Sequence, residues 1–292
     1  MKVLVTGGSS LLAQRTAEQL LARGDSVVLF QRRPTWLDTP QVLGDVRDAE
    51  LVDRAVGECD AVIHLAAKVG VVGSWHEYRS VNVDGTANVV AAARRHSLSR
   101  LVHVSTPSVA HAGDALVGVG ATPAVTGRKR AWYAESKALG EQLVLLAASD
   151  ALPTVVIRPH LVWGPGDTQL VGRIIERARA GRLALVGDGA ALIDTTYIDN
   201  AADALVAALD AAVPGAACIG KPYVIANGEP RPVAELVAGI CRAAGVNIAP
   251  RHVPRRAAYV AGSVVERLWA VRGADAAEPP LTVDQCAAPG TG

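Results

Sequence analysis

Short apolar runs alternate with segments of helical periodicity through the first half of the chain. An apolar run of about four to eight residues is typical of a buried strand, and apolar residues three or four positions apart are typical of a helix packed on a sheet. Strands that alternate with helices are joined by crossovers, so the pattern predicts an α/β fold with a parallel sheet. The expected strands are 2–6, 26–30, 61–67, 100–106 and 153–158, and the expected helices are 11–23, 48–57, 82–96 and 133–149.

The pattern changes after residue 158. Gly and Pro cluster in the segment WGPGD, and the short elements that follow do not continue the repeat of strand and helix. We therefore expect a doubly wound parallel-sheet domain over residues 1–158 and a smaller lobe over residues 159–292.

The turn after the first expected strand has the composition of a dinucleotide-binding loop. Small residues let the backbone approach a pyrophosphate closely, and the helix that follows offers unpaired N–H groups and the positive end of its dipole. The candidate cofactor-binding residues of this turn are Thr6, Gly7, Gly8, Ser9, Ser10, Leu11 and Leu12.

The end of the second expected strand indicates which dinucleotide binds. Gln31 stands where an acidic residue would hold an adenosine ribose hydroxyl, and Arg32 and Arg33 follow it. Without the carboxylate a 2′-phosphate is not repelled, and guanidinium groups can bind it, so the sequence favours NADP(H). The alternative, two solvated loop arginines, stays open.

Tyr133 and Lys137 stand four residues apart in a helical segment, and Thr106 ends an upstream apolar run. Residues four apart share a helix face, so we expect the lysine cation to lower the pKa of the phenol towards the neutral range. A phenol, an ammonium and a hydroxyl on a nucleotide-binding scaffold indicate a carbonyl reductase. The Tyr and Lys spacing alone is weak, and the surrounding motifs carry the interpretation.

Composition narrows the class of protein. Lys and Arg number 29 against 28 Asp and Glu, so no overall positive field recruits nucleic acid. The 4 Cys have neither metal-binding nor disulfide spacing, the His residues show no ligand spacing, and no metal is expected. The chain starts directly with a strand and a loop, and no apolar run reaches about 18 residues, so we expect a cytoplasmic protein.

Four segments in order give a resemblance to a known family: VHVSTPSV, YAESKALGE, VIRPHLVWGPGDTQLVGRI and LVGDGAALIDTTYIDNAADAL. With them the chain resembles the extended short-chain dehydrogenases/reductases of the 3β-hydroxysteroid dehydrogenase and epimerase group. Within that group it is similar to the 2-alkyl-3-oxoalkanoate reductases of bacterial long-chain olefin biosynthesis. The resemblance implies a Rossmann-type NADP(H)-binding domain with a substrate lobe behind it, and reduction of a β-keto acid by NADPH.

The resemblance also implies roles for individual residues. Thr106 is the catalytic hydroxyl, with Ser105 as its substitute, and Tyr133 donates the proton. Lys137 holds the nicotinamide ribose, and Asn82 supports the relay. The remaining implied cofactor contacts are Asp45 and Val46 at the adenine, Leu65, Ala66 and Ala67 at the pyrophosphate, and Pro159 and His160 at the carboxamide.

The resemblance leaves some positions open. Ser10 replaces the second glycine of the family's loop, and it either hydrogen-bonds the phosphate or weakens binding. Residues 128–130 are either solvated or a clamp for the substrate carboxylate. Residues 255–272 form an apolar helix edged by arginines, which packs in the core, covers a lipid-like substrate or touches a membrane surface. The end of the chain is expected to be shortened relative to the family.

Two further expectations concern partners and alternatives. The apolar excess of helices 82–96 and 133–149 matches the four-helix contact through which family members dimerise, so we expect a homodimer, with contacts to other pathway enzymes left open. The alternative functions are an NAD-dependent 3β-hydroxysteroid dehydrogenase, a sugar-nucleotide epimerase or dehydratase, and a non-catalytic NADP-sensing or partner-binding protein.

Overall fold

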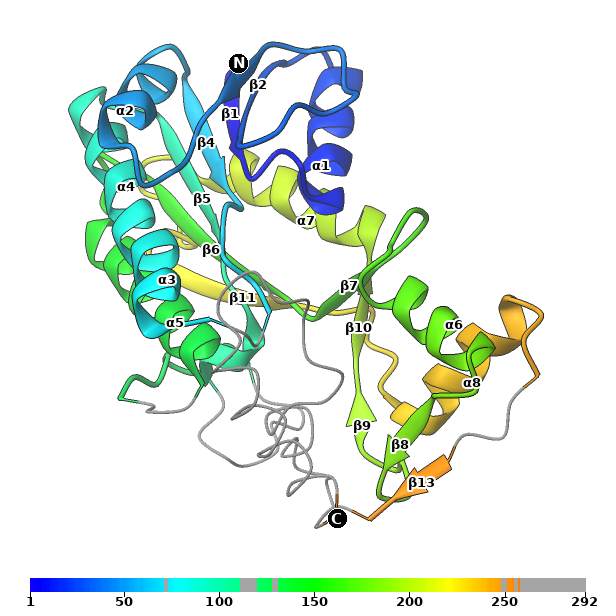
Figure 1. The fold of residues 1–292 in the computed structure, drawn as a ribbon. Coiled ribbons are helices and arrows are strands. Elements are labelled where there is room, and N and C mark those ends of the chain that lie inside the picture. The colour runs from blue at the N-terminus through cyan, green and yellow to red at the C-terminus, as the bar shows by residue number, and fades with distance from the viewer. Residues whose placement is uncertain (71–72, 111–119, 128–130, 248–250, 255–256, 258–292) are drawn as a thin grey trace.

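The computed structural model describes residues 1–70, 73–110, 120–127, 131–247, 251–254 and 257 (Figure 1). The expected segments 128–130 and 255–272 fall outside this part of the chain, apart from residue 257.

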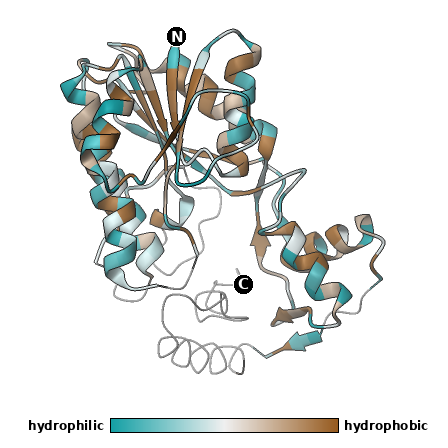
Figure 2. Ribbon diagram, turned by 45° about the horizontal axis from the view of Figure 1, so that its top comes forward, coloured by the Kyte–Doolittle hydropathy of each residue, from teal (hydrophilic) through white to brown (hydrophobic). Residues whose placement is uncertain are grey.

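A parallel sheet of seven strands forms the centre of the larger part, in the order β11-β6-β5-β4-β1-β2-β3. Its strands carry near-continuous apolar runs because helices cover both faces, as the brown strands of Figure 2 show. The strands are β1 (Lys2–Thr6), β2 (Ser26–Gln31), β3 (Gln41–Leu43), β4 (Ala61–His64), β5 (Arg100–Val104), β6 (Thr154–Pro159) and β11 (Lys221–Ile225).

The helices enclose two apolar cores, one on each face of the sheet (Figure 1). One core lies under α1 (Leu11–Ala22) and α7 (Ile198–Ala211), and the other lies under α2 (Ala49–Gly57), α4 (Gly85–Arg95) and α5 (Trp132–Ala147). On the second face, α3 (Trp75–Arg79) leads into a π-helical turn at Ser80–Asp84 that continues directly into α4. A 3-10 turn, Pro107–Ala110, follows β5.

The predicted division of the chain at residue 158 is wrong. β11 lies beyond that boundary, yet it pairs in parallel with β6, and α7 packs on α1 to cover the same sheet. Without β11, β6 would expose an unpaired edge, and its pairing with residues 221–225 removes that edge. The segment WGPGD therefore begins an excursion from the sheet and does not separate two domains.

The excursion builds the smaller lobe, which has its own apolar core of Ala178, Leu183, Leu185, Val237 and Cys241. It contains α6 (Val171–Arg179) and α8 (Val233–Ala243), which pack on each other. Three short strand pairs complete it: β7 (Leu161–Trp163) with β10 (Thr195–Tyr197), β9 (Leu192–Ile193) with β12 (Arg231–Pro232), and β8 (Ala184–Val186) with β13 (Arg251–Val253).

The expected elements of residues 1–158 are confirmed with shifts of a few residues, and some details differ. Neither β3 nor α3 was predicted, since they have only three and five residues. The expected helix 82–96 starts as the π-helical turn, in which Gly85 N–H bonds Ser80 O five residues back. No helix of the described residues is long and apolar enough to span a membrane.

A buried ion pair joins β6 to α5. Both carboxylate oxygens of Glu141 accept from the Arg158 guanidinium, one of them from Nε at 2.9 Å, and Arg158 Nη1 donates to Thr122 O at 2.7 Å. The two charged side chains have no exposed surface. A pair of this kind leaves a costly uncompensated charge when one partner is removed.

We predict that Glu141→Leu lowers the free energy of unfolding by about 3 to 5 kcal/mol, because it leaves the Arg158 charge buried and unpaired. The double variant Glu141→Leu with Arg158→Met should recover most of that loss. Denaturant unfolding measures both, with Glu229→Gln in the exposed Arg231–Glu229 pair as the control, for which about 1 kcal/mol or less is expected. Equal losses in the single and double variants would contradict the prediction.

Candidate functional site

The turn between β1 and α1 has the shape that close approach to a phosphate requires. Gly7 has a φ of 74°, and a Cβ at this position would lie 2.8 Å from the backbone nitrogen of Ala66. Only glycine fits both the backbone angle and the space. The turn therefore lies directly against Leu65 and Ala66, which follow β4. The sequence predicts Leu65, Ala66 and Ala67 as the other wall of a pyrophosphate groove.

Ser10 is the N-cap of α1. Its side-chain oxygen accepts from Ala13 N at 3.3 Å, and its backbone is extended, with a φ of −79°. This position thus needs no glycine, and a serine there stabilises the helix. The Ser10 hydroxyl proton stays available for a phosphate, because the cap uses only the oxygen as an acceptor.

Gln31 ends β2 as a buried side chain whose orientation Gln41 fixes. Gln41 Nε2 donates to the carbonyls of Thr35 and Leu37, both at 3.1 Å, so its oxygen accepts from Gln31 Nε2 at 2.7 Å. Gln31 Oε1 is left buried, without a hydrogen-bond partner among the described residues. It lies against Gly8, where a Cβ would come within 2.3 Å of it.

The Gln31 Oε1 atom can only accept a hydrogen bond, and a ligand atom that also only accepts would be repelled by it. It therefore fits a hydroxyl donor such as that of a ribose. Arg32 and Arg33 follow it on the surface, both exposed. The glycine turn, the start of α1 and the end of β2 all lie at the carboxyl edge of the sheet, where the strand order reverses between β1 and β4. Dinucleotides bind at such a switch point, and the residues present fit one.

The two predicted adenine contacts, Asp45 and Val46, already interact with other residues of the protein. Asp45 holds Arg47 through both oxygens, at 2.9 Å to Nε and 2.8 Å to Nη2. These hydrogen bonds lower the pKa of the Asp45 carboxyl, and the Arg32 charge acts in the same direction. Val46 is buried and packs on Gly85. Asp45 therefore lies near Arg32, but its carboxylate already has a cationic partner.

Tyr133 and Thr106 are brought together across the start of α5. The Thr106 hydroxyl lies near enough to the phenol to affect its pKa, and Thr106 Oγ1 also lies 3.0 Å from Ser108 Oγ, a hydroxyl that the sequence did not indicate. Burial raises the pKa of Tyr133, and the Thr106 hydroxyl only partly offsets this. The expected lowering of the Tyr133 pKa is therefore wrong for the structure, because desolvation of the phenolate outweighs the lowering by the Thr106 hydroxyl.

Lys137 is buried one turn after Tyr133 and donates from Nζ to Val104 O at 2.7 Å. Burial lowers the pKa of Lys137 to about 8, and the negative charge of Glu141 opposes this shift. The lysine therefore projects from α5 to the end of β5, next to Thr106.

Ser105 differs from its neighbour Thr106. It is buried, and its hydroxyl has no hydrogen-bond partner among the described residues. Because Thr106 and not Ser105 affects the pKa of Tyr133, the structure favours Thr106 over Ser105 as the group that acts with the phenol.

Asn82 lies in the π-helical turn, where its side chain is fully used. Its Oδ1 accepts from Lys68 N at 2.7 Å, and its Nδ2 donates to Lys68 O at 3.0 Å and to Ser136 Oγ at 2.9 Å. Gly140 lets α5 approach, because a Cβ there would lie 2.5 Å from Asn82 O. Asn82 thus fixes the loop after β4 against α5.

Pro159 and His160 follow at the end of β6, where His160 N donates to Ile225 O at 2.8 Å. They lie at the same carboxyl edge, at the start of the excursion to the smaller lobe. Asp199 at the start of α7 pairs with Arg15 at 2.6 Å, from Arg15 Nε to Asp199 Oδ1, and so ties α7 to α1.

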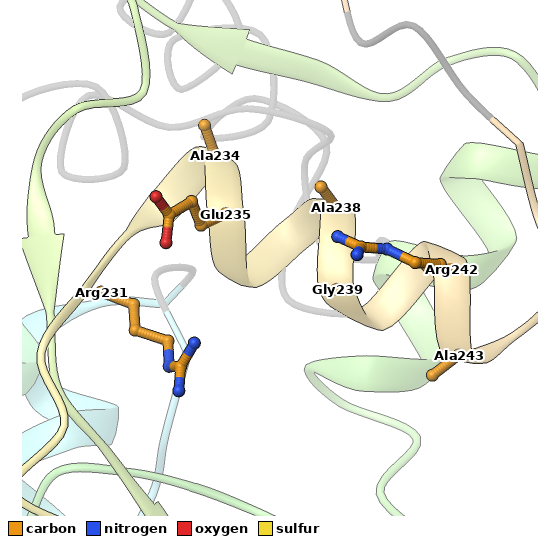
Figure 3. A pocket seen from close by; sticks show the side chains of 7 residues that line it. All are labelled: Arg231, Ala234, Glu235, Ala238, Gly239, Arg242 and Ala243. Atoms are coloured by element: carbon orange, nitrogen blue, oxygen red, sulfur yellow. The ribbon is translucent and has the colours of Figure 1, made fainter.

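A hollow of about 720 Å³ lies elsewhere, on the outer side of α8 (Figure 3). Its lining is Arg231, Ala234, Glu235, Ala238, Gly239, Arg242 and Ala243, and none of these is a predicted site residue. The predicted site residues therefore lie at the sheet edge and not at this hollow.

Comparisons with known proteins identify the family of the chain. The family model described as the NAD dependent epimerase/dehydratase family matches residues 3–226. The chain is 47% identical to a 2-alkyl-3-oxoalkanoate reductase of Stenotrophomonas maltophilia over 291 residues, which cover 97% of this chain and 87% of the relative. It is 33% identical to a 3-beta-hydroxysteroid dehydrogenase of Mycolicibacterium neoaurum, over 84% of this chain and 70% of that protein.

A solved structure shows the same architecture. The UDP-glucose 4-epimerase of Thermus thermophilus in complex with NAD aligns with a TM-score of 0.72 and 29% identity, over 87% of this chain and 86% of that one. The chain belongs to the NAD dependent epimerase/dehydratase family, among the extended short-chain dehydrogenases/reductases.

Proposed function

We propose that the protein reduces a 2-alkyl-3-oxoalkanoate to the 3-hydroxy acid with NADPH, in long-chain olefin biosynthesis. The family and the names of the relatives support an oxidoreductase with a nicotinamide cofactor, and the relative of 47% identity supports the substrate class. The observation that carries the proposal is the placement of the Thr106 hydroxyl beside the Tyr133 phenol, with Lys137 one turn further on.

The residues of the site perform the acid half of the reaction. The bound cofactor supplies a hydride to the ketone carbon. Thr106 and Tyr133 hydrogen-bond the carbonyl oxygen, which stabilises the negative charge that develops there, and the Tyr133 hydroxyl then gives its proton to that oxygen. A raised pKa suits this role, because it keeps the phenol protonated before the transfer. Lys137 holds the ribose of the cofactor and helps to return a proton to the phenol.

Two features support a lipid-like substrate and NADPH. Trp132 immediately precedes Tyr133, and its ring lies 5.5 Å from that of Trp75, so half-buried aromatic surface adjoins the start of the catalytic helix. Arg32 and Arg33 are exposed at the end of β2, free of an acidic neighbour on that strand, and suit a 2′-phosphate.

One observation favours a second candidate, an NAD-linked dehydrogenase acting on a hydroxysteroid. The buried acceptor Gln31 Oε1 suits a ribose hydroxyl, which NAD offers at both the 2′ and 3′ positions. Cofactor preference separates the two candidates. Turnover of a keto acid with NADPH would exclude a non-catalytic protein.

Replacement of Tyr133 with Phe should lower turnover with NADPH at least about a hundredfold, because general acid catalysis has that magnitude. The affinity for NADPH should change little. Steady-state kinetics and NADPH titration measure the two effects, with Tyr223→Phe at an exposed position as the control. Near-normal turnover of the folded Tyr133→Phe variant would refute the assignment.

The arginines predict the choice of cofactor. A guanidinium contact to a 2′-phosphate contributes about 1.5 to 3 kcal/mol, so NADPH should bind roughly tenfold to a hundredfold more tightly than NADH. Arg32→Ala with Arg33→Ala should remove most of this preference, and added Gln31→Asp should turn it towards NADH. The test measures the dissociation constants of NADPH and NADH for each variant at fixed ionic strength, with Arg54→Ala on α2 as the control. Equal binding of both cofactors by the wild type would favour the NAD-linked candidate.

The pKa of Lys137 predicts how NADPH binding depends on pH. The pKa of Lys137 in the free site is about 8. Above that pH the lysine loses its proton, so the ammonium that holds the ribose is lost. The dissociation constant should be constant below about pH 7.5 and rise up to about tenfold by pH 9. Titration at several pH values tests this, and Lys137→Met should show weaker binding without the rise. A wild-type curve as flat as that of the variant would count against the role of Lys137.

We also propose a homodimer, through the surfaces of α4 and α5. The exposed Leu146 lies on α5, 84% exposed, where a second copy would cover it. Light scattering at micromolar concentration should give about twice the chain mass, and Leu146→Glu should shift it towards the monomer. A monomer in the wild type would contradict the proposal.

A further inference from the structure

A buried imidazole, His64, lies at the end of β4 between the cofactor turn and the catalytic helix. In the sheet it is paired with Thr6 on one side and His103 on the other, so the three side chains form a row across β1, β4 and β5. All three are about 1% exposed. Burial lowers the pKa of His64 to about 3, so its ring is neutral and has one N–H donor and one acceptor nitrogen.

The hydrogen bonds of His64 have only one consistent direction. Thr86 Oγ1 donates to the carbonyl of Asn82 at 2.8 Å, so it must accept from His64 Nε2 at 3.0 Å. The other ring nitrogen, Nδ1, then accepts from Thr6 Oγ1 at 2.7 Å. Thr6 Oγ1 accepts in turn from Ala66 N at 3.1 Å.

From Asn82 the chain of bonds continues into α5. Its Nδ2 donates to Ser136 Oγ at 2.9 Å, and Ser136 Oγ donates to Tyr133 O at 2.9 Å. Every donor and acceptor in this series is used without conflict. It connects the wall of the cofactor turn with the backbone of the proton donor through the π-helical turn.

We propose that His64 is a positioning residue that couples the cofactor turn to the catalytic helix. Its rigid ring bonds Thr6 on one side and Thr86 on the other. The position of the turn after β1 and the position of α4 therefore depend on each other. The link to turnover rests on the proposed role of Tyr133. The link to cofactor binding does not.

His103 is a matched comparison within the same row. Its ring centroid lies 5.3 Å from that of His64, and it is equally buried. Neither of its ring nitrogens has a hydrogen-bond partner among the described residues. A change at His103 therefore alters the packing of a buried imidazole without breaking this series of bonds.

The first experiment compares His64→Phe, His64→Gln and His103→Phe as folded proteins. His64→Phe should weaken NADPH binding and lower turnover, each about tenfold, because both ends lose their alignment. His64→Gln should recover most of both, since its amide has one acceptor and one donor at a spacing close to that of the ring nitrogens. His103→Phe should change both values less than about threefold. Equal effects of the two Phe variants, or no recovery by Gln, would overturn the proposal.

A second experiment does not depend on whether His64→Phe folds. Thr6→Val breaks the series at the cofactor end and Ser136→Ala at the tyrosine end, and a double-mutant cycle on NADPH affinity measures their coupling. We expect non-additivity of at least about fivefold, whereas distant, independent sites add. Additive effects would overturn the proposal. Because the readout is NADPH binding, the cycle stands even if the protein fails to reduce the keto acid.

Discussion

The parallel sheet brings the carboxyl ends of all seven strands to one edge, and the site follows from this constraint. Strand interiors are apolar, and polar side chains begin where the strands end. There Thr6, His64 and His103 form a row under the helices. A buried polar atom without a partner is costly, and of these three side chains Thr6 and His64 have partners among the described residues. The bonds that satisfy Thr6 and His64 run from the turn after β1 to α5, so the pairing of polar groups also aligns these two elements.

Burial affects the ionisable side chains near this edge in different ways. Glu141 and Arg158 are fully buried and satisfy each other, which ties α5 to β6. Lys137 is buried without an ion pair among the described residues, and its pKa falls. Tyr133 stays protonated because its pKa rises. The same low polarity thus gives a lysine that loses its proton readily and a phenol that keeps its proton, which suits reduction of a ketone.

Much of the fold and part of the site could be predicted from the sequence because both depend on local pattern. Apolar periodicity gave the elements up to residue 158, and the spacing of Tyr133 and Lys137 placed them on one helix. Long-range pairing carries no such signal. The addition of β11 to the sheet, the link from Gln41 to Gln31, and the bonds of His64 with Thr86 join residues distant in the chain. The direction of the Tyr133 pKa shift depends on burial, which spacing alone does not reveal.

The most direct test of the account follows a labelled hydride. The purified protein is incubated with a 2-alkyl-3-oxoalkanoate and NADPH that carries deuterium at the transferred position of the nicotinamide, and the product is analysed by mass spectrometry. The account predicts one deuterium on the carbinol carbon of the 3-hydroxy acid and one NADPH consumed for each product molecule. A product without deuterium, or no product from a folded protein that binds NADPH, would contradict it.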